Sequence, residues 1–359
     1  MADLMTGTYE YAALAKKYGN FCVPVSKVKI SGVDILSTLS LSLAELKVVL
    51  ALQGSSIVVL KIADAYDMKS HSFMDKLKSK LVLGTIVEIE LGYLSSTLSV
   101  FKGYVATVGA DFSELPLFVA TLMDARRLMM TGGIRKVLHD VQNYSDACST
   151  ILKDYSKLCS ATIEATSDNL EKPLSQAVND YDFIMKELIQ NAKVDREFFV
   201  LGEKAYFRTP RSATSPIMTM NYGRELLSLS IQEEYADLSI DVVGYNAKEQ
   251  QVFHGTQDVA SASSQKKVMS QTPILMIADP EADTQEKVKN RALAVAKKQE
   301  WKSKTGEGTT IGLPEVVPGR FVKVKSLEEI ADNSYYITEV VHELNDESFM
   351  TRFTIGGWD

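Results

Sequence analysis

Two stretches of this chain share a spacing that decides the fold. The first reads GTIVEIELGY over residues 84–93, VFKGYVATV over 100–108 and LPLFVATLMD over 115–124. The second reads GRFVKVKSL over residues 319–327, SYYITEVVH over 334–342 and FMTRFTIGG over 349–357. Apolar and polar side chains alternate in both, with the two-residue period of a strand that buries one face.

An internal repeat accounts for the shared spacing. When Gly84 is aligned with Gly319, apolar residues fall at the same offsets. The matched pairs are Val87 with Val322, Ile89 with Val324, Phe101 with Tyr336, Val105 with Val340 and Phe118 with Phe353. Chance agreement between two alternating segments is the alternative, and the matched glycines and aromatic residues disfavour it. We predict two related antiparallel β-barrels, whose core or ring-forming strands contain Val87, Ile89, Leu91, Phe101, Val105, Val322, Val324, Tyr336, Val340 and Phe353.

The segments upstream of the two copies match more loosely. LSLSL at 39–43, followed by SIVV at 56–59, resembles LSLSI at 227–231 followed by SIDVV at 239–243. In the second copy, a polar stretch and a helix-forming segment separate these strands from Gly319. The second barrel is therefore predicted to be discontinuous.

The whole chain is accordingly predicted to be mainly β with α+β insertions. The predicted divisions are an N-terminal arm (1–20), a first β-barrel (21–130), a helical or α+β middle region (131–207), a second β-barrel in two parts (208–252 and 308–359), and a polar loop with a long helix inserted into it (253–307).

Capping residues and apolar spacing predict three helices. Ser145 is the expected N-cap of the first, and the second is expected to begin near Asn179 or Asp180. Asp279 is the expected N-cap of the third and longest helix, with Pro280 in its first turn. The preceding segment, residues 257–272, is rich in Ser, Gln and Lys and is predicted to be a loop.

Composition excludes several classes of protein. The 359 residues include 39 Lys and Arg against 46 Asp and Glu, which gives a formal net charge of −7. An acidic chain is a poor candidate for a protein whose main task is binding nucleic acid. Its 3 cysteines do not make a disulfide framework. Its most apolar stretch, Val48 to Ala65, is interrupted by polar residues and is too polar for a membrane helix, so we predict no membrane anchor.

A search for catalytic and ligand-binding motifs finds none of the common ones. The 4 histidines lie far apart, and His342 is interpreted as a partly buried strand residue. The glycine-rich segment 306–312 follows a helix and precedes a strand, which is the reverse of a phosphate-binding loop. The acidic pairs Glu88/Glu90 and Glu233/Glu234 are interpreted as solvated strand faces or turns. We therefore predict no enzyme activity, no cofactor and no metal site.

Three segments carry a family resemblance. The first is LGTIVEIELGY with VFKG, over residues 83–103. The second is QAVNDYDFIMKELIQNAKVDREFFVLGEKAYF, over residues 176–207. The third, GEG at 306–308 followed by PG at 318–319, YITEVVH at 336–342 and FTIGG at 353–357, is the most specific. Together these segments resemble the phage late control protein D family, the central baseplate hub proteins of contractile tails, whose fold also forms the base of type VI secretion spike proteins and occurs in R-type bacteriocins.

The resemblance implies a structural role. It implies a homotrimer of tail-tube-like, two-barrel subunits that joins a hexameric inner tube, or a tube-initiator protein, to a trimeric central spike. Implied further partners are baseplate wedge proteins and a tape-measure protein in the lumen. Such a protein is assembled in the bacterial cytoplasm and becomes part of a phage tail or released particle. Because the chain stops after the second barrel, the spike is expected to be a separate polypeptide. The alternative is a baseplate-associated cell-wall hydrolase.

Overall fold

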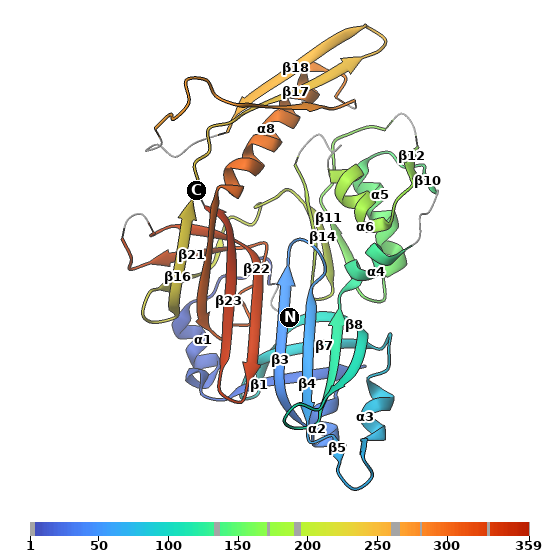
Figure 1. Cartoon of the computed structure of the whole chain (residues 1–359), viewed down its shortest axis with the longest axis vertical. Helices are drawn as coiled ribbons and strands as arrows, with labels where there is room; N and C mark the ends of the chain where they lie inside the picture. The colour runs from blue at the N-terminus through green and yellow to red at the C-terminus, as the bar shows by residue number, and fades with distance from the viewer. Residues whose placement is uncertain are drawn as a thin grey trace.

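The protein is described by a computed structural model. It describes residues 4–132, 137–170, 173–189, 195–259, 266–280, 282–328 and 331–358. The structure is mainly β, as predicted, and most of its strands pair antiparallel. Figure 1 shows the large sheet in the lower part of the view, with smaller modules above it.

The first β unit is a sheet with the strand order β3–β4–β9–β8–β7–β1. Its strands are β1 (Pro24–Ile30), β3 (Ser42–Ala51), β4 (Ile57–Ala63), β7 (Ile86–Tyr93), β8 (Ser96–Asp111) and β9 (Leu117–Met123). Along β4 the apolar residues Val58, Leu60 and Ile62 are fully buried and their neighbours are half-buried. This alternation confirms that one face of the unit packs into a core.

Short elements complete the first β unit. They are β2 (Val33–Asp34), which pairs with β1, the helices α2 (Ile35–Leu39) and α3 (Asp75–Lys80), and the small hairpin of β5 (Tyr66–Asp67) with β6 (Ser72–Phe73). The first residue of the expected LSLSL strand, Leu39, instead ends α2, because Ser40 adopts a left-handed conformation that turns the chain into β3.

The second β unit repeats this strand order as β16–β20–β23–β22–β21–β15. Its strands are β15 (Pro216–Asn221), β16 (Leu226–Glu233), β20 (Lys304–Ile311), β21 (Phe321–Lys325), β22 (Ser334–Asn345) and β23 (Phe349–Trp358). Corresponding strands also carry β-bulges at corresponding places. The register shifts at Leu43/Glu45 in β3 and at Leu226/Ser228 in β16, each facing an uninterrupted partner strand.

Equivalent backbone hydrogen bonds hold the two matched glycines, Gly84 and Gly319, in position. The amide of Gly84 donates to the carbonyl oxygen of Val105, and the amide of Gly319 donates to that of Ile337. Both glycines have positive φ, 86° and 81°, which other residues adopt at a cost. The structure thus retains the match of β7 with β21, but the counterpart of Val105 is Ile337 and not Val340. The bulges in β8 and β22 shift the pairing away from the plain sequence offset.

The structure corrects one part of the upstream sequence match, the pairing of residues 56–59 with residues 239–243. In the strand order, β20 is the counterpart of β4, whereas residues 239–243 lie in a separate three-stranded sheet. The alternation of that segment reflects a different sheet with its own core. Among the described strands, none between Glu233 and Lys304 belongs to the large sheet, so this sheet leaves out residues 239–252, which were predicted to belong to the second barrel.

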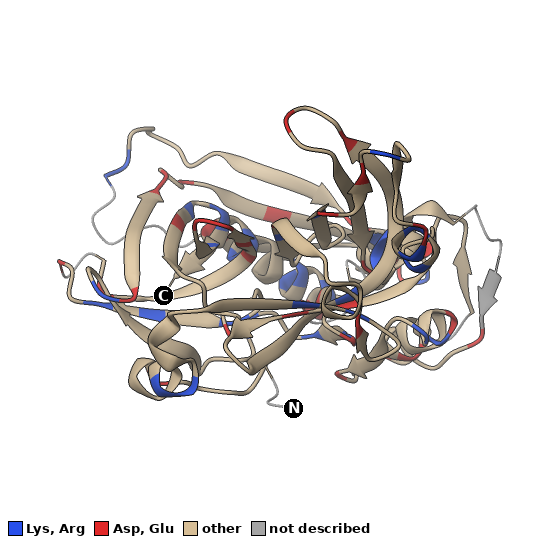
Figure 2. Cartoon of the chain, turned by 90° about the horizontal axis from the view of Figure 1, so that it is seen from below, with Lys and Arg blue, Asp and Glu red and all other residues tan. Residues whose placement is uncertain are grey.

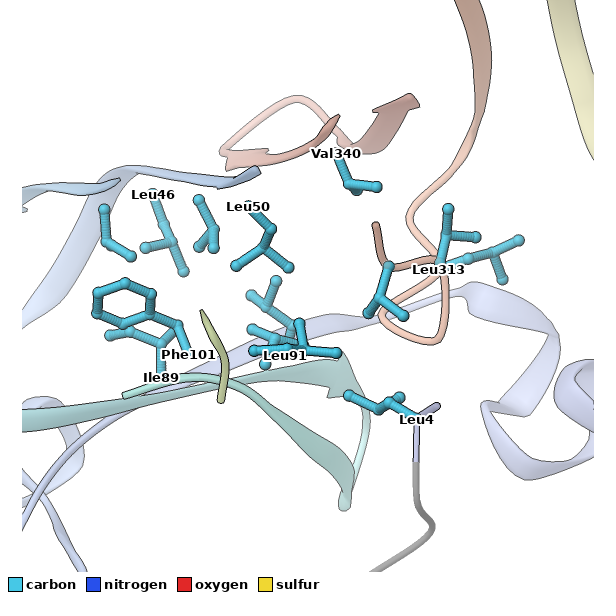
Figure 3. Packing of buried hydrophobic residues seen from close by; sticks show 14 of the residues in the cluster. Leu4, Leu46, Leu50, Ile89, Leu91, Phe101, Leu313 and Val340 are labelled. Atoms are coloured by element: carbon cyan, nitrogen blue, oxygen red, sulfur yellow. The ribbon is translucent and has the colours of Figure 1, made fainter. Parts of the chain in front are cut away.

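The two β units form one continuous sheet. Residues 339–345 of β22 pair antiparallel with residues 45–51 of β3, while the first part of β22 pairs with β21. Their buried side chains form a single cluster. In Figure 3, Leu46 and Leu50 point toward Ile89, Leu91 and Phe101 across this core. Within the described ranges, the strand order is an open path and shows no closed barrel, so the division into two barrels stays a prediction.

A middle module follows β9. It contains α4 (Ala125–Thr131), β10 (Val137–His139), α5 (Tyr144–Leu152), η2 (Lys153–Tyr155), β11 (Ser160–Ile163), β12 (Leu174–Gln176), α6 (Asp180–Asp182), the π-helical η3 (Phe183–Leu188), β13 (Glu197–Leu201) and β14 (Lys204–Arg208). Asn143, not Ser145, caps α5, because its side chain accepts the amide hydrogen of Asp146. The module has its own core.

An insertion module separates β16 from β20. It contains β17 (Ser239–Asn246), β18 (Gln251–Asp258), β19 (Ile274–Ala278) and the long helix α8 (Gln285–Lys302). The helix begins after its N-cap Thr284 and not at Asp279, whose amide still donates to Val243 of β17. Within the predicted loop 257–272, residues 257–258 end β18, and residues 260–265 lie outside the described residues. Residues 266–272 are described and belong to no helix or strand. The amide of Glu234 donates to Ser303 at 2.7 Å, which joins the two ends of the module.

The N-terminal arm crosses to the second β unit. It includes α1 (Tyr11–Lys17) and η1 (Gly19–Phe21), which lead into β1 of the first unit. The buried guanidinium of Arg320, beside β21, donates to the carbonyl oxygens of Leu4 and Gly7 at 2.7 and 2.9 Å. The carboxylate of Glu315 accepts from Lys17 and from the hydroxyl of Tyr18. The arm therefore ties the two β units together.

Candidate functional site

In the described part of the chain, β8 and β16 of the large sheet each have an edge without a strand partner, as does the β1–β2 end of the sheet. Residues 106–111 of β8 pair with β9, and in the described part of the chain they have no backbone partner on the opposite edge. β16 ends the sheet, because it pairs only with β20 among the described strands. Apolar side chains stand at both places: Val108 is 42% exposed, Phe112 62% and Leu227 44%. Unpaired edges of this kind are sites where a further strand can add.

Inside the chain, the corresponding edges are covered. β22 is the counterpart of β8, and β3 is the counterpart of β16. Within the chain, β22 and β3 pair with each other. Leu46 and Val48 of β3 are fully buried at this junction, as is Val340 of β22. The same strand edges are thus paired once within the chain and lack a strand partner once among the described residues.

A groove lies beside the free edge of β8. It has a volume of about 650 Å³ and is lined in part by Pro24, Ser42, Asp111, Leu115 and Asn345. Leu115, in the turn between β8 and β9, is 70% exposed. The groove therefore extends the exposed surface at the β8 edge.

The predicted core and ring-forming residues lie away from these edges. All ten are buried and belong to the one large core cluster. Their burial places them in the sheet interior, while their part in ring formation stays a prediction. The residues on the free edges were missed, although the alternation of Leu227, Leu229 and Ile231 had marked β16 as a strand.

Three groups with the chemistry of catalysis, His342, Cys148 and Cys159, are buried. His342, expected to be partly buried, is fully buried, and its Nδ1 lies 2.9 Å from the hydroxyl of Thr351. Burial lowers the pKa of this imidazole to about 3, so it is neutral at physiological pH. Cys148 and Cys159 are buried, and burial raises the pKa of the Cys159 thiol to about 11. Such thiols are poor nucleophiles.

One of the two carboxylate pairs has side-chain partners, and the other is exposed. Glu90 accepts hydrogen bonds from Lys29 and from Thr97, and Glu88 lies 3.9 Å from Lys102. Glu233 and Glu234 lie at the exposed end of β16. Figure 2 shows acidic and basic segments interspersed over the visible elements. No group of three or more potential metal ligands occurs in the described ranges.

A buried polar cluster joins the middle module to the second β unit. Glu197 of β13 accepts from Arg208 at 2.8 Å and from the hydroxyl of Tyr336 at 2.8 Å. The guanidinium of Arg211 stacks over the indole ring of Trp301 in α8. Burial, opposed by the charge of Arg208, raises the pKa of Glu197. These contacts hold three parts of the chain in one arrangement.

The sequence matches one family model. The model described as the Alg8 N-terminal domain matches residues 22–346. The chain belongs to this family. No curated protein matches the sequence of this Alg8 N-terminal domain protein. No helix in the described part of it is both long and apolar enough to cross a membrane.

Solved structures share the fold of this family member. The 43 kDa tail protein of prophage MuSo2 from Shewanella oneidensis superposes with a TM-score of 0.71 and 12% identity, over 94% of this chain and 100% of that one. A tail protein from Neisseria meningitidis MC58 gives a TM-score of 0.68 and 10% identity, over 94% and 97%. The Escherichia coli c3393 protein, a component of the type VI secretion system described as similar to T4 bacteriophage tail proteins gp27 and gp5, gives 0.56 and 10% identity, over 93% and 77%. The chain therefore has the fold of these tail proteins.

Proposed function

We propose that the chain is a structural hub of a contractile tail or injection particle. The observation that carries the proposal is the likeness to whole tail proteins, which extends over 94% of this chain and essentially all of theirs. The proposed subunit is a homotrimer that joins a hexameric inner tube, or a tube-initiator protein, to a trimeric central spike. Baseplate wedge proteins and a tape-measure protein are proposed as further contacts.

The repeated β units support this stoichiometry. Each chain carries two units with the same strand order, and β3 and β16 carry a bulge at corresponding positions. The outermost strand differs, because β1 pairs antiparallel with β7 and β15 pairs parallel with β21. Three chains around a threefold axis would present six similar units, which matches a hexameric tube on one face and a trimeric spike on the other. The late control protein D resemblance points to the same assembly. The proposed site of action is the baseplate of a particle assembled in the bacterial cytoplasm.

Reconstitution tests the proposal. The purified chain should have the mass of three chains by multi-angle light scattering, and it should bind the tube and spike proteins of the same particle in a pull-down. Cryo-electron microscopy of the particle should place it between the two. A strict monomer that binds neither protein would contradict the proposal. Clearing of peptidoglycan in a zymogram by the purified chain would favour the hydrolase alternative.

A further inference from the structure

The first described residues form a short strap on the second β unit. This strap, residues 4–9, precedes α1 and belongs to no helix or strand. Its first two side chains, Leu4 and Met5, are 9% and 5% exposed and belong to the large core cluster. In Figure 3, Leu4 lies at the border of the labelled core residues. The strap thus places two adjacent apolar side chains in the core.

Two hydrogen bonds attach the strap to β15. The amide of Tyr9 donates to the carbonyl oxygen of Ile217 at 2.7 Å. The hydroxyl of Thr8 donates to the carbonyl oxygen of Pro216 at 3.2 Å. Among the described strands, β15 pairs with β21 alone, so the strap supplies contacts to a strand that has a single strand partner.

A buried guanidinium holds the strap by its main chain. Arg320, which is fully buried, donates to the carbonyl oxygens of Leu4 at 2.7 Å and Gly7 at 2.9 Å. It also donates to the carbonyl oxygen of Ser215 at 3.0 Å. Without the strap, the guanidinium would lose two of these three acceptors, which is costly for a charged group in a buried position. Arg320 and residues 215–217, the seat of the strap, therefore favour a bound peptide main chain.

The remainder of the arm is anchored separately from the strap. The hydroxyl of Tyr18, a fully buried side chain, donates to Glu315 at 2.7 Å. Between the two attachments, Glu10 is extended and exposed. The strap can thus leave its seat by rotation about a few backbone bonds without disturbing Tyr18. Ordering its six residues costs conformational entropy, which opposes its contacts and places it among the segments that open locally.

We propose that the seat is a peptide-binding site whose resident ligand is the strap, and that the strap leaves and rebinds while both β units stay folded. The ligand class is a short peptide with two adjacent apolar side chains and with main-chain carbonyl groups, three residues apart, that Arg320 can bind. The proposal concerns the single chain and does not depend on the proposed hub function.

Native-state hydrogen exchange of the full-length chain, followed by NMR, tests the reversible opening. The amide of Tyr9 reports on the strap, and the amide of Ile337, which donates to the carbonyl oxygen of Arg320 at 2.9 Å, reports on the seat. Tyr9 should exchange roughly a hundredfold faster than Ile337, and low concentrations of urea should speed exchange at Ile337 alone, because local opening exposes little surface. Equal rates with an equal urea dependence would overturn the proposal, since the strap would then open only when the chain unfolds.

A charge in the strap provides the variant. Leu4→Asp should speed exchange at Tyr9 by about tenfold or more, because a carboxylate is costly to bury in the core, while Ile337 keeps the protection of a folded chain. Ala12→Asp is the matched control: it adds the same charge to an exposed position of α1, and exchange at Tyr9 should stay as in the wild type. Loss of protection at both amides in Leu4→Asp, or unchanged exchange at Tyr9, would overturn the proposal.

Peptide binding in trans tests the site itself. A fluorescent peptide with the sequence of residues 4–10, LMTGTYE, should bind the full-length Leu4→Asp protein saturably in fluorescence anisotropy. Wild type should bind it at least about tenfold more weakly, because its own strap competes at a high effective concentration. The control peptide carries Asp in place of its Leu and Met and should not bind.

Arg320→Lys in the Leu4→Asp background tests the role of the guanidinium. Lysine keeps the charge but lacks the planar fork that bonds several carbonyl oxygens at once, so binding of the peptide should weaken by about tenfold or more. Protection of Ile337 in the same protein verifies that the chain is folded. Equal binding of the two peptides, or no binding of LMTGTYE to the Leu4→Asp protein, would overturn the proposal.

Discussion

Acidification is expected to weaken the junction of the two β units through His342. This side chain lies in β22, opposite Val48 of β3 and Thr351 of β23. It is fully buried, and burial lowers its pKa to about 3 from an ordinary value near 6.5. The contacts of the folded state therefore hold the imidazole neutral.

The sign and the size follow from proton linkage. Between about pH 6.5 and pH 3, the unfolded chain carries a proton on this imidazole that the folded chain does not. The contribution to stability is complete above pH 6.5 and is lost as the pH falls. The free energy of unfolding should decrease by about 1.4 kcal/mol per pH unit, and so by about 2 kcal/mol between pH 6.5 and pH 5.

Urea unfolding of the wild type and of His342→Gln at pH 7 and pH 5 measures this effect. The variant keeps a polar side chain but has no proton to gain, and every group outside this position is common to both proteins and cancels in the comparison. The wild type should lose about 2 kcal/mol more than the variant. An equal pH dependence in the two proteins, or an NMR titration of the His342 ring near pH 6, would refute the reasoning.

Three further outcomes are expected. Arg126→Ala removes the buried partner of Asp124, whose carboxylate lies 2.7 Å from the guanidinium, and should cost about 3 kcal/mol in urea unfolding; a loss below about 1 kcal/mol would contradict this. Gly84→Ala should cost about 1 kcal/mol through its positive φ alone, and Gly319→Ala more, because its Cβ would also lie within 3.4 Å of three side-chain atoms; equal losses would contradict the difference. Trp301→Ala removes a ring that packs on β23 and should speed proteolysis of the insertion module several-fold, with unchanged cleavage arguing against an anchoring role.

Local patterns predicted the strands but not their partners. The alternation over residues 84–93 and 319–327 predicted β7 and β21, because a half-buried strand imposes that period wherever it lies. The alternation of residues 239–243 is just as regular, yet β17 belongs to the insertion module. Which sheet a strand joins depends on contacts between residues distant in sequence, and a period of two contains no information about them.

Local sequence patterns also do not predict where α8 begins or which strand edges are exposed. Asp279 followed by Pro280 is a strong capping pattern, but the backbone of Asp279 remains bonded to β17, and Thr284 caps the helix instead. The exposed edges of β8 and β16 are defined by the absence of a neighbouring strand in the described sheet. Only the strand order shows which edges are covered, so no residue pattern could have marked them.

The hydrogen bond between Glu234 and Ser303 has an evolutionary consequence. Because the chain leaves β16 and re-enters β20 at neighbouring residues, the 68 or so residues between them can be exchanged for another segment, or for a short turn, without altering the path of the large sheet. Natural selection can then change the insertion module to suit new binding partners while the large sheet keeps its geometry. Related chains should differ most in length and sequence between these two positions.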